Sequence, residues 1–205
     1  MMPRRLAALA TLFAPLALTV FLVAACSSAP PPPPQFADIR FTNKPPIVLR
    51  ASIVDIRDEY EPPFKPPFVE QTFPIPPARA VANWARDRLK ATDPSSPQRV
   101  RVTITDASVK EIDLRLTPGL RGAFTKDQSQ RYDASVALRV DLLDDHGSPV
   151  RSVTASATRS RTVAEDITLN DRDRVFYTMT EQLMQDLDQD LDSKIRGSFD
   201  PYVVS

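Results

Sequence analysis

The chain has 205 residues, of which 26 are basic and 26 acidic, so its formal net charge is zero. Loss of residues 1–25 would remove Arg4 and Arg5 but no acid, which leaves 24 basic against 26 acidic residues and a net charge of −2. This balance offers no basic footprint for nucleic acid, so we expect no nucleic-acid partner. The length suffices for one domain with a hydrophobic core.

The rarest residue types restrict the chemistry further. Cys26 is the one cysteine and His146 the one histidine of the chain. A single cysteine excludes an intramolecular disulfide, and a metal site of cysteine and histidine ligands is nearly excluded with it. The sequence therefore predicts no cofactor and no metal.

The first residues have the layout of an export signal. Arg4 and Arg5 form a short basic start, and the following stretch, Leu6–Ala25, is apolar and free of charge. That stretch is about long enough to cross a bilayer as an uncleaved helix. Pro15 in its middle favours a signal peptide over such a helix.

The apolar stretch ends in Val23-Ala24-Ala25-Cys26, which resembles the lipobox of bacterial lipoproteins: an aliphatic residue, two small residues, then cysteine. The resemblance implies that residues 1–25 are a signal peptide, that Cys26 receives a diacylglycerol, and that this cysteine becomes the mature N-terminus. A thiol is the group to be alkylated, and small residues give a peptidase access to the backbone. Two or three acyl chains would anchor the protein stably to a membrane.

Residues 26–44 follow as a proline-rich tether. Five successive prolines, Pro30–Pro34, favour extended polyproline II, at about 3.1 Å per residue. We therefore expect a semi-rigid stalk that lifts the domain off the lipid. Ser27 after the cysteine, in place of aspartate, resembles lipoproteins sorted to the outer membrane, which implies a domain facing the periplasm.

Residues 45–198 are expected to form a single α/β domain, followed by a C-terminal tail of residues 199–205. The first element is a predicted strand over residues 47–56, which are β-branched and apolar. A helix is predicted over residues 78–91, and Pro77 stands where a proline begins a helix well. One face of this helix carries Val81, Trp84, Ala85 and Leu89. This spacing favours a core role for the tryptophan over a role as a ligand platform.

Three more strands and a second helix complete the pattern. Residues 99–105 alternate cleanly, and a slip at their end indicates a bulge. Residues 132–142 are apolar at every second position, and a hairpin turn with Gly147 leads to a return strand over 150–163. An amphipathic helix beginning at Asn170 follows. Its apolar stripe consists of Phe176, Met179, Leu183, Leu187, Leu191 and Ile195.

The element order is therefore β-α-β-β-β-α. Both helices must bury their apolar stripes on one face of the sheet, which predicts an α/β two-layer sandwich with a mixed four-stranded sheet. The first strand, helix and second strand form a βαβ unit, so those two strands should be parallel. The later strands are joined by hairpins and should be antiparallel.

This layout resembles that of small α/β bacterial envelope lipoproteins, among them the lipoprotein partner of the lipopolysaccharide-insertion barrel and the auxiliary lipoproteins of ABC-type lipid transporters. The resemblance rests on the lipobox Val23–Cys26, the proline tether and the element order from Ile47 to Ile195. It implies a membrane-anchored, non-enzymatic accessory factor in envelope assembly or lipid transport, with an envelope protein as partner. The alternative is a carrier that binds a lipid or another amphiphile between sheet and helices.

Catalysis finds little support in the sequence. His146 falls in the hairpin turn beside Asp144 and Asp145, where a solvated turn residue is the ordinary interpretation. A second acidic run resembles a calcium loop but lacks the glycine and the glutamate that an EF-hand requires, and its helical pattern favours a solvated helix face. That run consists of Asp186, Asp188, Asp190 and Asp192. We therefore expect no enzyme.

Two long irregular segments supply the candidate partner contacts. Residues 61–77 carry Phe64, Phe68 and Phe73, and residues 114–130 carry Leu116, Leu120 and Phe124. Apolar residues in such segments either fold back on the core or meet a partner. Both alternatives stay open for the six residues at this point.

Arginines recur at strand positions expected to face outward. They could meet lipid phosphates, but acids on the same face favour cross-strand pairing. The set is Arg99, Arg101, Arg131, Arg139, Arg159 and Arg161.

The lipobox yields a first prediction. Cells that express the protein in the presence of a clickable fatty acid should label it, and Cys26→Ala should carry no label, because the thiol is the acceptor. Ser28→Ala, which alters a neighbouring residue, should keep the label. Label retained by Cys26→Ala would exclude lipid attachment at this cysteine.

Overall fold

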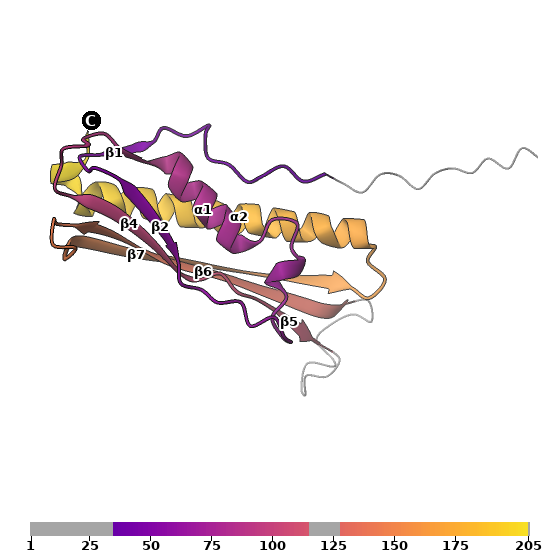
Figure 1. The fold of residues 1–205 in the computed structure, drawn as a ribbon. Coiled ribbons are helices and arrows are strands. Elements are labelled where there is room, and N and C mark those ends of the chain that lie inside the picture. Colours follow the sequence, from indigo (N-terminus) through magenta and orange to yellow (C-terminus); the bar gives the residue numbers. More distant parts are fainter. Residues whose placement is uncertain (1–34, 115–127, 205) are drawn as a thin grey trace, which may run out of the picture. The chain divides into compact units, whose positions relative to one another are not determined.

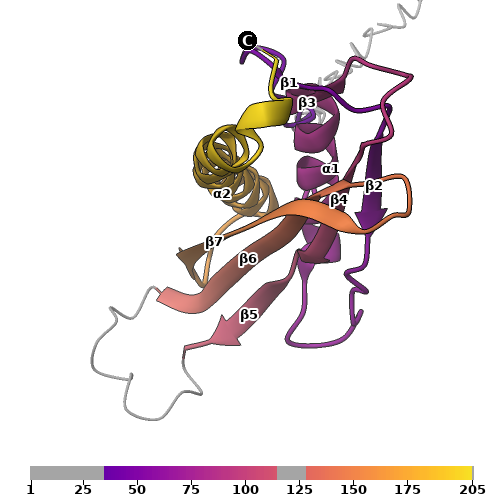
Figure 2. The same cartoon turned by 90° about the vertical axis from the view of Figure 1, so that its left-hand side faces the viewer.

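The computed structural model describes residues 35–114 and 128–204. A mixed β-sheet carries two helices on one face, α1 (Pro77–Arg88) and α2 (Leu169–Ser198) (Figures 1 and 2). This confirms the predicted α/β fold, in which both helices bury their stripes on the same side of a sheet. Within the described ranges, neither helix is long and apolar enough to cross a membrane.

The main sheet has five strands, two of which follow one another along the same side of a third. β2 (Val54–Asp58) is parallel to β4 (Arg99–Asp106), and β4 is antiparallel to β6 (Gln128–Leu143). After a bulge, β5 (Val109–Asp113) continues along the same side of β6, while β7 (Pro149–Ala164) pairs with the other side of β6. The count of five corrects the predicted four, because the expected bulge divides one strand position between β4 and β5.

The predicted strand over residues 47–56 is in fact two strands. β1 (Ile47–Leu49) leaves the main sheet and pairs in parallel with β3 (Leu89–Ala91), which is why α1 ends earlier than predicted. The run breaks where the fully buried Ala51 is followed two residues later by Ile53, which is 53% exposed. The predicted parallel βαβ arrangement therefore occurs twice around the same helix. β1 and β3 flank α1 in the small sheet, and β2 and β4 flank it in the main sheet.

The folded domain extends beyond both of its predicted boundaries. Ile39 and Phe41, placed in the expected tether, are buried against the core. In the expected tail, Phe199 is fully buried, a short 3₁₀ helix, η2, spans Asp200–Tyr202, and the Val204 amide donates to the backbone of β1 at 2.9 Å. These segments are parts of the domain.

The core lies between the sheet and the helices. Every residue of the predicted α2 stripe is buried, and Trp84 of α1 is fully buried, as predicted. The rings of Phe176 and of Tyr132 from β6 form a T-shaped pair, with centroids 4.7 Å apart. On β7, Val153 and Ala155 face α2, and their small side chains allow the helix to approach the sheet closely.

A buried carboxylate joins α1 to α2. Asp188 Oδ1 accepts hydrogen bonds from Trp84 Nε1 and Arg88 Nε, both at 2.7 Å, and Lys44 Nζ donates to Asp188 Oδ2 at 2.5 Å. The side chains of Arg88 and Asp188 are each 3% exposed. The predicted solvated face is therefore wrong at Asp188, because this residue follows Leu187 and lies three positions before Leu191, both fully buried.

The neighbours of Asp188 stabilise its ionised form. Burial by itself would raise the pKa of this carboxyl, but hydrogen bonds from Lys44, Trp84 and Arg88 and the Arg88 charge bring the pKa below its ordinary value. The ionised form is therefore the one that the fold stabilises.

Asp188→Asn should lower the free energy of unfolding by about 3–5 kcal/mol, because the buried Arg88 would lose its buried counter-charge and keep only the partly exposed Asp192 as an acidic partner. Asp190→Asn is the matched control on the same helix: Asp190 pairs with Lys194 at 2.7 Å on the exposed face, and its loss should change stability by less than about 1 kcal/mol. Urea unfolding followed by circular dichroism measures both. Equal effects would contradict a special role for Asp188.

The same pair of variants carries a prediction about pH. A carboxyl whose pKa is depressed by folding contributes its stability above the unfolded-state value, here 3.8, and loses it as the pH falls towards the folded-state value. The stability difference between the natural chain and Asp188→Asn should thus be constant near neutral pH and shrink below about pH 4. A difference that grew on acidification would contradict the depressed pKa.

Candidate functional site

The Pro/Phe loop, residues 61–76, is fastened to the outer edge of β5. The Val69 amide donates to the Val109 carbonyl at 2.9 Å, and the Glu111 amide donates to the Pro67 carbonyl at 2.8 Å. Phe68 lies opposite Lys110 in an isolated antiparallel bridge. The segment predicted to be irregular therefore closes one sheet edge with a short backbone ladder.

A buried glutamate anchors this loop from its interior. Glu70 opens a short 3₁₀ helix, η1 (Glu70–Thr72), and is almost fully buried. Its Oε1 accepts from the Tyr60 hydroxyl at 2.8 Å, and its Oε2 accepts from the Val109 amide at 3.3 Å. Burial, with the hydrogen bond to Glu70, raises the pKa of the Tyr60 hydroxyl. Glu70 is thus a structural clamp, and no spacing in the sequence distinguishes it from an exposed acid.

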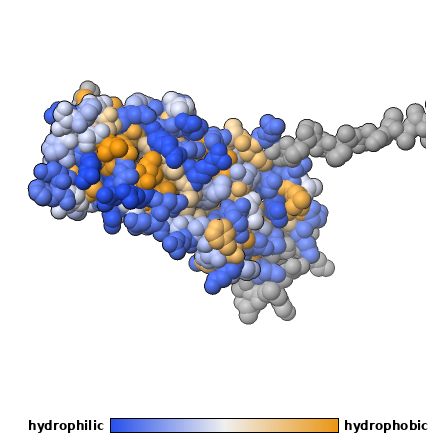
Figure 3. All heavy atoms as spheres, in the orientation of Figure 1, coloured by the Kyte–Doolittle hydropathy of each residue, from blue (hydrophilic) through white to orange (hydrophobic). Residues whose placement is uncertain are grey.

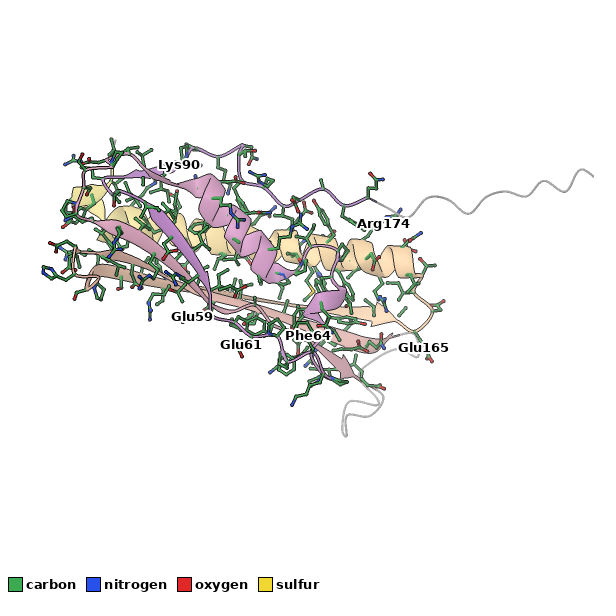
Figure 4. All side chains as sticks on the ribbon, in the orientation of Figure 1. Glu59, Glu61, Phe64, Lys90, Glu165 and Arg174 are labelled. Atoms are coloured by element: carbon green, nitrogen blue, oxygen red, sulfur yellow. The ribbon has the colours of Figure 1, made fainter. Side chains whose placement is uncertain are left out.

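The three phenylalanines of the loop have three different environments. Phe73 is buried and its ring stacks on Phe176, with centroids 4.1 Å apart and planes at 2°. Phe68 is half-buried, and Lys110 Nζ lies 5.4 Å from its ring centroid. Phe64 is 71% exposed. Phe73 therefore folds back on the core, and Phe64 is the phenylalanine that stays open to a partner (Figure 4).

The backbone of Phe64 is unusual as well. Its φ of 51° lies in the left-handed region, where a residue with a Cβ is strained by about 1–2 kcal/mol. A large aromatic residue seldom occupies that region, and strain of this kind concentrates at functional sites. Exposure and backbone together single out Phe64 as the candidate contact residue of the loop.

Four predicted site residues fall outside the described part of the chain. Leu116, Leu120 and Phe124 belong to residues 115–127, and the lipid-attachment residue Cys26 belongs to residues 1–34. Their roles stay predictions.

His146 lies in the β6–β7 hairpin turn, as predicted, and is exposed. Its Nδ1 is 2.6 Å from Asp145 Oδ1, while Asp144 Oδ1 accepts from the amides of His146 and Ser148. Gly147 has a φ of 81°, the positive value that the turn requires. The described geometry gives Asp144 a turn-capping role.

The six arginines do not share one environment. Arg131 and Arg139 each pair with the acid two residues further along the same strand, at 2.9 Å and 2.8 Å. Arg159 and Arg161 lie on the helix side of β7, where Arg161 Nη2 donates to Gln182 at 2.7 Å and Arg159 pairs with Asp186. The expected cross-strand pairing occurs at Arg101, whose Nε is 3.7 Å from Asp55 Oδ2 of β2; the other pairs form within a strand or with α2. Arg99 and Arg101 remain on the outer face.

The carrier alternative requires space between sheet and helices. In the described residues that region is one continuous cluster of buried side chains, among which Trp84, Tyr132, Phe176, Met179 and Leu183 are fully buried. The packing therefore offers no support for an amphiphile bound between the layers.

No protein-family model matches the chain, and no curated protein matches it in sequence. Solved structures give distant similarities. A minor lipoprotein from Acinetobacter baumannii is 12% identical, with 77% of this chain and 98% of that chain covered and a TM-score of 0.38. A protein from Caulobacter crescentus CB15 proposed to be a lipoprotein is 8% identical (70% and 90% covered, TM-score 0.35). A Xanthomonas campestris protein of the family DUF330 is 11% identical (80% and 93% covered, TM-score 0.28). The chain is thus distantly similar in structure to bacterial lipoproteins, a similarity that assigns it no function.

The different environments of Phe64 and Phe73 give a paired prediction. Phe73→Ala should lower the free energy of unfolding by about 3–5 kcal/mol, because it leaves a cavity against Phe176. Phe64→Ala should change it by less than about 1 kcal/mol, because the side chain contacts mainly water. Urea unfolding measures both variants. A large loss in the free energy of unfolding for Phe64→Ala would mean that Phe64 is a packing residue.

Proposed function

We propose that the protein is an exported lipoprotein, attached through Cys26 to the outer membrane with its domain in the periplasm, and that it serves as a non-enzymatic accessory factor in envelope assembly or lipid transport. The observation that carries the proposal is the lone cysteine at the end of Val23–Cys26. Cys26 is the one thiol of the sequence, so it is the one side chain that could accept the diacylglycerol.

The environment of the ionisable side chains supports action by contact rather than by catalysis. The buried acids of the described part, Glu70, Asp141 and Asp188, each accept hydrogen bonds from neighbouring donors. His146 is the one histidine of the sequence, and it points to solvent from a turn. Histidine is the most frequent general base of enzymes, so catalysis by this chain would have to use another residue type as its base.

The proposed partner surface is the Pro/Phe loop around Phe64. Its backbone is fixed to β5 and Phe73 anchors it in the core, so Phe64 is presented on a rigid support. Interfaces favour aromatic residues that are ordered before binding, because less conformational freedom is then lost. The partner that suits an anchored periplasmic domain is an integral membrane protein of the envelope.

Site-specific crosslinking tests the proposal. A photoreactive phenylalanine derivative at position 64 should crosslink in cells to an integral membrane protein, while the same derivative at the exposed Leu169 should not. Phe64→Ser should then abolish co-purification of the crosslinked protein without lowering the melting temperature. Crosslinks of equal yield at both positions, or none at position 64, would contradict a partner surface at the loop.

A further inference from the structure

A cleft of about 490 Å³ opens where β2 and β4 begin and β6 ends, beside α1. Four of the residues that line it are arginines: Arg57, Arg86, Arg99 and Arg101. Asp55 is the single acid of the lining, so the cleft carries an excess of three positive charges. We call it the arginine cleft.

The strand register brings these arginines together. β2 and β4 run in parallel with Asp55 opposite Arg101. Because alternate residues of a strand share a face, Arg57 and Arg99 lie on the same outer face as that pair. Arg86 reaches the cleft from the last turn of α1, next to the edge strand β2.

The arginines of the cleft are not neutralised as those elsewhere on the sheet are. Asp55 Oδ2 is 2.8 Å from Arg57 Nε and 3.7 Å from Arg101 Nε, so one carboxylate is shared by two guanidinium groups. Arg86 donates to the neutral Asn83 at 3.2 Å. Across the described residues, no carboxylate lies within ion-pair distance of Arg86 or Arg99.

Two further features of the cleft suit an anion. Arg101 Nε is buried and has no hydrogen-bond partner. The same is true of Arg159 Nε and Arg172 Nε elsewhere in the described residues, so this atom supports the site only together with the shared carboxylate of Asp55. The two guanidinium groups that share the single Asp55 carboxylate leave a net positive charge, which a bound anion would offset. By contrast, Arg131 and Arg139, on the same face, each have their own acid.

We propose that the arginine cleft binds a phosphate group. The planar guanidinium fork matches the oxygens of a phosphate in a bidentate geometry, and several forks from different elements can surround one such group. Ile53 beside the arginines is 53% exposed, and Figure 3 shows apolar surface ringed by hydrophilic residues on this side of the molecule. An apolar part of a phosphate-bearing ligand would find contact there. This site is independent of the anchoring at Cys26 and of the contact at Phe64.

Calorimetric titration of the full-length protein in nonionic detergent with inorganic phosphate tests the proposal. We expect saturable binding, a higher melting temperature in phosphate than in chloride of equal ionic strength, and affinity at least about tenfold weaker in Arg99→Gln and in Arg101→Gln. Arg131→Gln removes a charge of the same face outside the cleft and should leave the affinity unchanged. Melting temperatures of the variants in chloride verify that each one folds.

Short-chain lipids, used below their micelle concentration, identify the source of the phosphate. If dihexanoylphosphatidylglycerol binds about tenfold more tightly than inorganic phosphate and zwitterionic dihexanoylphosphatidylcholine does not, the natural ligand is a lipid headgroup. Equal or tighter binding of inorganic phosphate supports a free phosphate or a soluble ester. The proposal is overturned if none of these probes binds at roughly 10 mM, or if Arg131→Gln weakens binding as much as Arg99→Gln does.

Discussion

The position of the two helices depends on the buried charge of Asp188. Its carboxylate joins three distant parts of the chain: Lys44 before β1, Trp84 and Arg88 of α1, and its own helix α2. An ionised group in a protein interior is tolerated only when its partners are in place, so a shift of either helix would leave a charge unpaired. Apolar packing is non-directional, whereas the hydrogen bonds from Trp84 and Arg88 to Asp188 require one placement of α1 against α2. That placement also fixes where Arg86 and the β1–β3 pair lie.

Hydrophobic periodicity predicted the elements whose environment is uniform along their length. The stripe of α2, the β6–β7 hairpin and the parallel βαβ order all follow from local pattern. The division of residues 47–56 and the end of α1 do not, because both depend on pairing between β1 and β3, which are remote in sequence. Asp188 has the same residue type and local spacing as its three acidic neighbours, yet its helical phase places it beside the buried Leu187 and Leu191. The helical phase of Asp188 is thus the feature that separates it from the other three acids.

The candidate sites were predictable as segments but not as residues. Phe64 and Phe73 stand in the same proline-rich composition, and what separates them is Phe176, a stacking partner from the other end of the chain. Alternation correctly placed Arg99 and Arg101 on the outer face. It could not show that acids two residues further along the strand neutralise Arg131 and Arg139, because such pairing depends on side-chain conformation.

The two proposed surfaces lie at opposite ends of β6. The Pro/Phe loop is fastened to β5 at Lys110, which pairs with Asp133, whereas Arg99 of the cleft pairs with Leu143. Ten residues of strand at about 3.4 Å each separate these positions by about 34 Å. A protein contact at Phe64 would therefore not cover the arginine cleft, and both could be occupied at once. Because β6 is paired with β7 along this stretch, a phosphate-bearing ligand and a membrane protein partner would be held at opposite ends of the same strand (Figure 1).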